Sequence, residues 1–156
     1  MRRNDRELKT IEELSDVINS GLVAQVAFVQ NNEPYIVTMN YGSSVDGTKI
    51  KLFFHSAGEG RKIDCIKENP NVCFTIAVCD PLIEGEKACD YSMKFRSVVG
   101  YGKMRIIEDE NEKIFGLNRI MNHYTRVDSW DYNKDMLKNT TLICLDVESL
   151  SGKRKS

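Results

Sequence analysis

The stretch from Phe54 to Asp64 contains the residues best suited to bind an anion. Gly58 and Gly60 follow an apolar strand pattern, and Arg61 and Lys62 begin the helical pattern that comes next. Backbone N–H groups in the first turn of a helix are unpaired, and the helix dipole favours negative charge there, so two cations at this end suggest a bound anion. Glycine lets the backbone approach such a ligand closely. These residues favour a phosphate site, although a solvated Arg-Lys pair after an ordinary turn fits them equally well.

Length and composition favour one domain with a substantial core, since the chain has 156 residues of which 41% are hydrophobic. A formal net charge of −1 argues against general affinity for nucleic acid or for anionic membranes. The sequence contains no apolar run long enough to cross a bilayer and no apolar N-terminal segment typical of a secretory signal, so we expect a cytoplasmic protein. Five cysteines without a C-x-x-C pair indicate reduced core thiols rather than a metal site.

The elements expected around the anion site alternate between strands and a few helices. A capping box at Thr10–Glu13 predicts a helix that ends at Gly21, a second helix begins near Gly60 and ends before Pro70, and a third follows Asp109. Period-two patterns predict strands over residues 22–29, 35–41, 49–55, 72–78, 91–107 and 141–147, with an exposed loop over 80–90. This order predicts a small antiparallel barrel over residues 1–150, followed by a loose basic tail over 151–156.

Several segments in this order resemble one family of flavoproteins. They are His55-Ser56, Gly60-Arg61-Lys62, Glu68-Asn69-Pro70 and Phe95 to Gly102. Together they resemble the pyridoxamine 5′-phosphate oxidase-related proteins, and most closely the nitroimidazole-resistance (Nim-type) branch, over roughly residues 5–147. The resemblance implies a mainly β split barrel that binds FMN, with FAD as the other candidate flavin. It also implies a homodimer in which each flavin lies at the subunit interface and contacts both chains.

The resemblance also assigns roles to individual residues. Arg61 and Lys62 would hold the flavin phosphate, with His55, Ser56 and backbone N–H groups near Gly60 completing the site. Arg96 and Ser97 match a second patch that reaches the cofactor. The isoalloxazine ring would lie along the strand formed by Val37, Thr38, Met39 and Asn40.

Two departures from the family pattern bear on the reaction. The oxidases proper have serine or threonine where Gly60 stands, so Ser56 or the backbone would have to replace that phosphate contact. The C-terminal arginine-rich signature that recognises the pyridoxal substrate is absent, and Ser149 to Gly152 stand near the end of the chain instead. We therefore do not expect oxidation of vitamin B6.

The activity implied by the resemblance is reduction of a small electrophile such as a nitroaromatic, with electrons supplied by a separate donor. His55 is the candidate for proton transfer or substrate contact, because imidazole titrates near neutral pH. A structural role for His55, such as bonding the phosphate, is the favoured alternative. Two other functions stay open: a flavin-binding redox sensor or buffer without turnover, and a haem-binding split barrel that uses His55 or His123.

Overall fold

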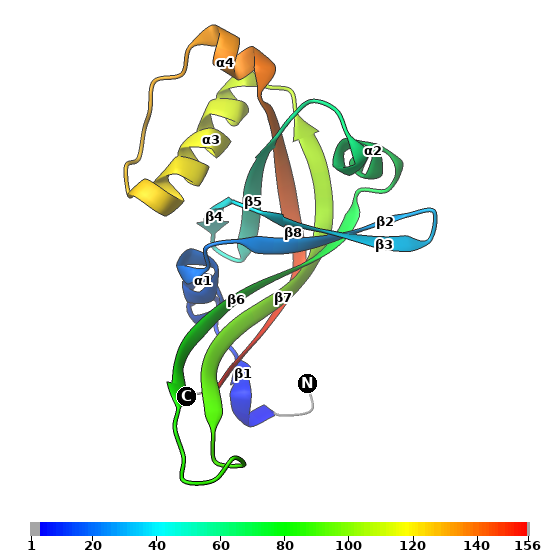
Figure 1. Ribbon diagram of the computed structural model, residues 1–156. Helices are drawn as coiled ribbons and strands as arrows, with labels where there is room; N and C mark the ends of the chain where they lie inside the picture. The colour runs from blue at the N-terminus through cyan, green and yellow to red at the C-terminus, as the bar shows by residue number, and fades with distance from the viewer. Residues whose placement is uncertain (1–3, 156) are drawn as a thin grey trace.

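The computed structural model describes residues 4–155, and strands outnumber helices in it (Figure 1). The helices are α1 (Ile11–Ser20), α2 (Arg61–Glu68), α3 (Glu110–Thr125) and α4 (Lys134–Asn139), with a 3-10 turn at Asn4–Arg6. The strands are β1 (Glu7–Leu8), β2 (Ala24–Gln30), β3 (Glu33–Met39), β4 (Gly42–Asp46), β5 (Lys49–Ser56), β6 (Asn71–Ile83), β7 (Ser92–Ile107) and β8 (Thr141–Lys155). Within residues 4–155, no helix combines the length and the apolar character needed to span a membrane.

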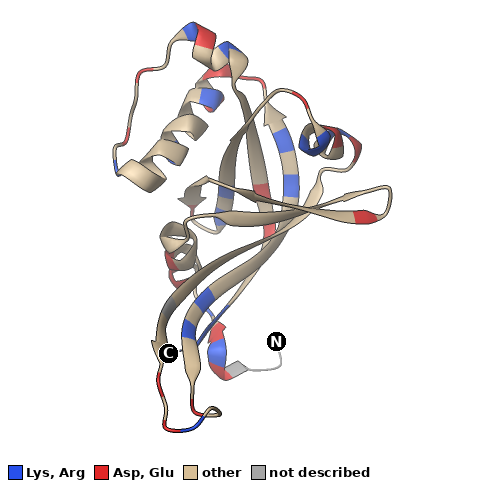
Figure 2. Ribbon diagram, in the orientation of Figure 1, with Lys and Arg blue, Asp and Glu red and all other residues tan. Residues whose placement is uncertain are grey.

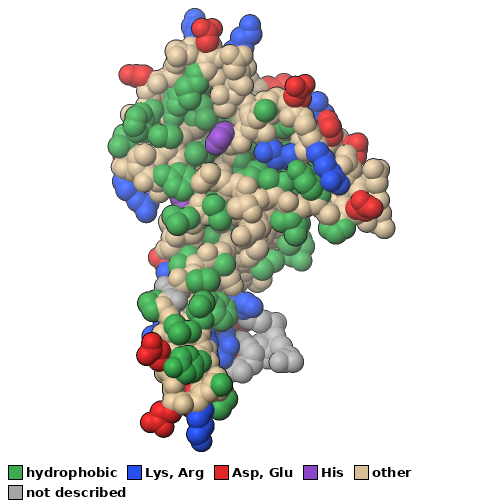
Figure 3. Space-filling model, viewed as in Figure 1, with side chains coloured by type: hydrophobic (Ala, Val, Ile, Leu, Met, Phe, Trp, Pro, Cys, Tyr) green, Lys and Arg blue, Asp and Glu red, His purple; other side chains and the backbone are tan. Residues whose placement is uncertain are grey.

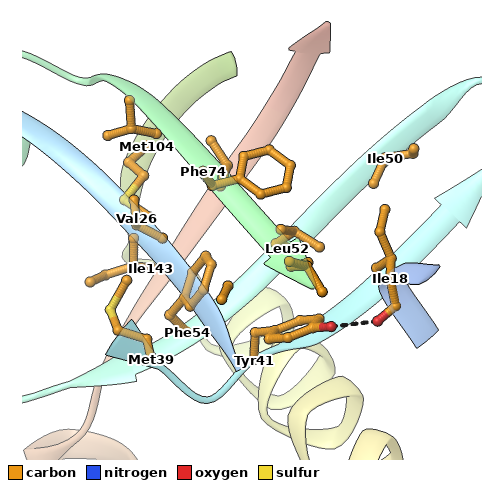
Figure 4. Close-up of a cluster of buried hydrophobic side chains, with 14 of the residues drawn as sticks. Ile18, Val26, Met39, Tyr41, Ile50, Leu52, Phe54, Phe74, Met104 and Ile143 are labelled. Atoms are coloured by element: carbon orange, nitrogen blue, oxygen red, sulfur yellow. Dashed lines mark hydrogen bonds between the residues drawn. The ribbon is translucent and has the colours of Figure 1, made fainter. Parts of the chain in front are cut away.

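The strands form one curled antiparallel sheet in the order β3-β2-β6-β7-β8-β5-β4, and β1 pairs with β8. The edge strands β3 and β4 are joined only by Asn40 and Tyr41, so the two edges of the sheet approach each other at this corner. Side chains from opposite parts of the sheet meet inside, as Figure 4 shows for Val26, Phe54 and Ile143. The chain therefore has the mainly β, antiparallel split-barrel fold that the sequence predicts.

A second, smaller core lies on the outer side of β5, beneath α3. Leu52 and Phe54 point into the barrel, whereas Phe53 joins Leu117 and Ile120 of α3 in the second core. Adjacent residues of a strand point to opposite faces, so β5 is buried on both sides. This double burial fixes the strand that leads directly into the predicted anion site.

Helix α1 begins with the predicted capping box. The Thr10 hydroxyl accepts a hydrogen bond from the Glu13 N–H at 3.2 Å, and the Glu13 carboxylate accepts one from the Thr10 N–H at 3.3 Å. The same Glu13 forms an ion pair with Arg154 of β8 at 3.1 Å, and Asp16 pairs with Arg96 of β7. Helix α1 is thus attached to the lower part of β7 and β8 (Figures 1 and 2).

The structure corrects several expected boundaries. Strand β4 and helix α4 are additional elements, and β6 continues through Ile83 into the segment expected as a loop. Residues 151–155, expected as a loose basic tail, extend β8 instead: Lys155 pairs with Phe95 of β7, and Lys153 pairs with Glu7 of β1. Ser156 lies outside the described residues. These pairings join residues far apart in sequence, which local patterns do not report.

The cysteines are only in part the core thiols that the sequence indicates. Cys65 and Cys144 are buried, and burial raises the pKa of the Cys144 thiol to about 12. Cys73 is partly buried, whereas Cys79 and Cys89 are exposed. All five are free thiols, and residues 4–155 contain no cluster of side chains suited to a metal ion.

Candidate functional site

The N-terminus of α2 is open and is not capped by a side chain. Gly60, the N-cap residue, has φ +116° and ψ 169°, a conformation that residues with a Cβ rarely adopt. Its carbonyl accepts hydrogen bonds from the N–H groups of Ile63 at 2.9 Å and Asp64 at 3.1 Å. A Cβ built on Gly60 would meet no atom within 4 Å, so the space beside the helix end is free. The geometry fits an anion at the first N–H groups of α2.

Packing holds this helix end in place at one end of the barrel (Figure 1). Ile63, Cys65 and Ile66 are buried in the main core, while Arg61 on the first turn stays exposed. The helix stops at Glu68 before Asn69-Pro70, as the proline predicts. A four-residue turn links Ser56 of β5 to α2, so the strand end and the helix end are adjacent.

Arg61 reaches across to the β2–β3 hairpin. Its Nε donates a hydrogen bond to Oε1 of Gln30 at 3.0 Å, and its guanidinium carbon lies 4.3 Å from the centroid of the Tyr35 ring. Figure 3 shows basic side chains where α2 meets this hairpin. One predicted phosphate ligand is therefore placed beside the start of β3, the strand predicted to carry the flavin ring.

Lys62 lies beside Arg61 but is more buried. Burial lowers the pKa of its ammonium group below the ordinary value. Among residues 4–155, no ion pair or side-chain hydrogen bond is found for Lys62. A partly desolvated cation without a counter-charge gains most from an arriving anion, because the anion replaces the hydration that burial removes.

His55 and Ser56 belong to opposite faces of β5. Ser56 follows Phe54 on the side of the barrel core that also buries α2, whereas His55 follows Phe53 on the α3 side. His55 is exposed and pairs with Leu142 of β8. Alternation along the strand therefore favours Ser56, and not His55, as the side chain that faces the helix end.

The four residues predicted to lie along the ring are on β3 and the corner after it. Within residues 4–155, strand β3 pairs only with β2, so the backbone N–H and C=O groups on its other edge have no strand partner there. Thr38 and Asn40 are exposed, whereas Val37 packs on the core and Met39 is buried. The exposed positions and the open edge are suited to polar contacts with a flat ligand.

A hydrogen-bond cluster that the sequence analysis did not identify fixes the end of this strand. The Tyr124 hydroxyl accepts hydrogen bonds from the Tyr41 N–H at 3.0 Å and from Asn40 Nδ2 at 3.2 Å, and it donates to the Leu22 carbonyl at 2.8 Å. Next to it, buried His123 donates from Nε2 to the Gly21 carbonyl at 2.7 Å. These partners are more than 80 residues apart, and the only local signal was the helical pattern of α3.

Arg96 and Ser97 lie elsewhere in the chain. They pair with Val78 and Ala77 of β6, whereas β2 crosses β6 at residues 73–75. Arg61 lies on the far side of that crossing, beside the end of β2. A single chain therefore does not bring Arg96 close to Arg61, and the cofactor contact of Arg96 and Ser97 stays a prediction.

The outer face of β2, β6 and β7 carries a separate apolar groove of about 340 Å³. Its lining includes Ala27, Val29, Cys73 and Tyr101, and none of the predicted phosphate ligands. Tyr101 is 58% exposed and Val29 is 43% exposed. A contiguous apolar surface of this kind is typical of a protein interface.

Comparisons with known proteins identify the family of this chain. The family model for pyridoxamine 5′-phosphate oxidase matches residues 10–154. A "putative 5-nitroimidazole antibiotic resistance protein" of Bacteroides thetaiotaomicron is 31% identical, with a TM-score of 0.82 over 95% of this chain and 86% of that one. No curated protein matches the sequence.

More distant structures share the fold. A flavocytochrome from Azotobacter vinelandii is 19% identical, with a TM-score of 0.79 over 100% of this chain and 72% of that one. An FAD and haem binding protein from Mycobacterium smegmatis is 17% identical, with a TM-score of 0.81 over 97% and 74%. From the family match over nearly the whole chain, we conclude that this protein belongs to the pyridoxamine 5′-phosphate oxidase family.

Proposed function

We propose that the protein binds FMN between α2, the end of β5 and the edge of β3, and that it reduces small electrophiles such as nitroaromatics. The observation that carries the proposal is the open N-terminus of α2, where Gly60 leaves space, Arg61 is held in place and Lys62 has no counter-charge among the described residues. The residues present therefore fit a phosphate. The similarity to the Bacteroides thetaiotaomicron protein supports a nitroimidazole or related compound as the substrate.

Each residue has a part in this proposal. Arg61, Lys62, Ser56 and the N–H groups after Gly60 bind the phosphate. Val37, Thr38, Met39 and Asn40 orient the ring along the edge of β3. Bound FMN would supply the redox chemistry, taking electrons from a donor and passing them to the electrophile. Because His55 is exposed on the other face of β5, a structural role is favoured for it over proton exchange with substrate, and Arg96 and Ser97 would contact the cofactor of a second copy.

A homodimer is part of the proposal. The apolar groove around Tyr101 and Val29 gives β2, β6 and β7 a surface that a second copy would cover. The groove lies on the same strands that carry Ser97 and Gln30. A second copy bound there could therefore contact both the phosphate site beside Gln30 and the second cofactor patch at Ser97. A reducing compartment such as the cytoplasm suits the five free thiols.

Two alternatives make different predictions. A redox sensor or buffer would bind the same flavin without turnover. If a haem were bound through an imidazole, His55 would have to supply it, because Nε2 of His123 is already bonded to the Gly21 carbonyl. FAD in place of FMN would require room beyond the phosphate.

The proposed reaction can be tested in a single turnover. The flavin-loaded protein is reduced anaerobically with dithionite, freed of excess reductant and mixed with a 5-nitroimidazole, and flavin absorbance is followed. Reoxidation faster than that of free reduced FMN at equal concentration, with the nitro group consumed, supports a reductase. Reoxidation no faster than free FMN would contradict the reductase and favour the sensor.

A further inference from the structure

The contact between Arg61 and the β2–β3 hairpin has a consequence for ligand recognition. Both groups that hold the guanidinium, the Gln30 amide and the Tyr35 ring, come from the hairpin and not from α2. Arginine has five N–H donors in a planar fork. Gln30 occupies the donor on Nε, and Tyr35 covers one face of the plane, which leaves the four N–H groups on the two terminal nitrogens for a ligand.

The hairpin is built to hold these two side chains still. Asn31 and Asn32 both have positive φ, 52° and 62°, which makes a two-residue turn that matches the twist of the strands. Gln30 closes this turn opposite Glu33. The Tyr35 ring lies 6.0 Å from the ring of buried Phe28, which anchors it to the main core. An otherwise flexible, exposed arginine is thereby restricted in orientation before ligand arrives.

We propose that Gln30 and Tyr35 are positioning residues that aim Arg61 at the phosphate of the flavin. The inference rests on the proposed function and specifies how its phosphate is recognised. An arginine ordered in advance loses little side-chain entropy on binding and can offer a bidentate contact to a phosphate. The alternative is that these contacts only attach α2 to the hairpin. Removing them would then weaken binding of the whole flavin and not only of its phosphate.

The experiment compares FMN with riboflavin, which lacks the phosphate. Dissociation constants for both are measured by fluorescence titration with the wild-type protein and with Gln30→Leu, Tyr35→Leu and Tyr35→Phe. The ratio of riboflavin to FMN dissociation constants reports the phosphate contribution. We expect Gln30→Leu and Tyr35→Leu to lower this ratio by about tenfold, the size of one charge-assisted hydrogen bond, with riboflavin affinity unchanged. Tyr35→Phe keeps the ring and should keep the ratio.

A double-mutant cycle tests whether the effect passes through Arg61. In an Arg61→Ala background, Gln30→Leu should not lower the ratio further, because the group that it positions is gone. Tyr91→Leu, an exposed tyrosine in the β6–β7 loop, is the matched control and should leave both constants unchanged. Thermal unfolding of every variant identifies any that fails to fold. If the Gln30 variant fails to fold, the cycle is made with Tyr35→Leu and Arg61→Ala instead, and the reverse applies if the Tyr35 variant fails.

Three results would overturn the inference. An equal loss of FMN and riboflavin affinity would assign Gln30 and Tyr35 to holding the hairpin and α2 together. An unchanged ratio in a wild-type protein that does prefer FMN would reject the positioning role alone and leave the proposed function standing. A wild-type protein that binds neither flavin would reject the proposed function and this inference with it.

Discussion

The hydroxyl of Tyr124 accepts the backbone N–H of Tyr41 at 3.0 Å and so joins the C-terminal turn of α3 to the corner between β3 and β4. The same hydroxyl donates to the Leu22 carbonyl at 2.8 Å. Replacing Tyr124 by Phe keeps the ring but leaves that N–H and that carbonyl without their partner. We expect the free energy of unfolding to fall by about 1–2 kcal/mol, measured by urea denaturation.

Because this corner ends the strand predicted to carry the ring, Tyr124→Phe should also broaden the visible spectrum of bound FMN. Tyr91→Phe, in the exposed loop between β6 and β7, is the control and should change neither quantity. If Tyr124→Phe lowers stability but leaves the flavin spectrum unaltered, the corner between β3 and β4 does not orient the flavin ring.

The phosphate cations give the second prediction. Arg61→Ala should weaken FMN binding by about 1.5–3 kcal/mol, because a charge-assisted hydrogen bond is lost. Lys62→Met keeps most of the side-chain volume and should weaken it by a comparable amount. Isothermal titration with FMN measures both effects. Riboflavin affinity should not change in either variant. An equal loss of riboflavin affinity would show that the phosphate does not bind at α2.

The two neighbours on β5 should differ. Ser56→Ala is expected to lower FMN affinity by about fivefold, the value of a neutral hydrogen bond, because Ser56 is on the side of α2. His55→Gln should change FMN affinity by less than about twofold, since His55 is on the opposite face. If His55 exchanges protons with substrate, its variant alters the pH profile of nitro reduction. The reverse order of affinities would contradict the strand alternation described here.

The fourth prediction concerns pH and His123. Burial lowers the pKa of this imidazole below its ordinary value of 6.5, and the groups around it are Tyr41, Tyr124 and Arg126. As the pH falls below 6.5, the unfolded chain takes up a proton that the folded protein resists, so the free energy of unfolding decreases.

His123→Gln retains an N–H donor for the Gly21 carbonyl but does not titrate. Thermal unfolding between pH 7.5 and 5.0 should therefore show a steeper loss of stability for wild type than for His123→Gln. Identical slopes for wild type and His123→Gln would show that His123 does not contribute to acid sensitivity.

The end of β8 gives the fifth prediction. Deleting residues 151–156 removes strand pairing with β7 and β1 and uncovers Leu8, so we expect a loss of about 2 kcal/mol or more in urea denaturation. Replacing Lys153, Arg154 and Lys155 by serine keeps the backbone pairing and should cost about 1 kcal/mol, because ion pairs this exposed are weak. A deletion that leaves the free energy of unfolding unchanged would contradict this pairing and support the loose tail expected from the sequence.

Local signals predicted much of the fold correctly. The capping box at Thr10 and the proline after Asn69 mark helix ends through contacts within a few residues. The register of β7 with β8 shifts between Tyr101 and Gly102, next to a glycine of the kind that often marks a β-bulge. Such features depend on neighbouring residues, so one sequence is enough to find them.

The features that the sequence missed depend on distant partners. Strand β4 begins with Gly42 and ends with Asp46, residue types that are depleted in strands, and it forms because β5 provides a partner. Arg96 carried a motif typical of the family, yet in the structure it forms an ion pair with Asp16 on α1. The contacts of Arg61 with Gln30 and Tyr35 cross about 30 residues and also have no local signature.

The most direct test of the central claim is the absorbance spectrum of the purified protein, followed by acid release of the ligand and its identification by mass. The account predicts two flavin bands and released FMN at one per chain. A Soret band, or a colourless protein that does not take up added FMN, would contradict it.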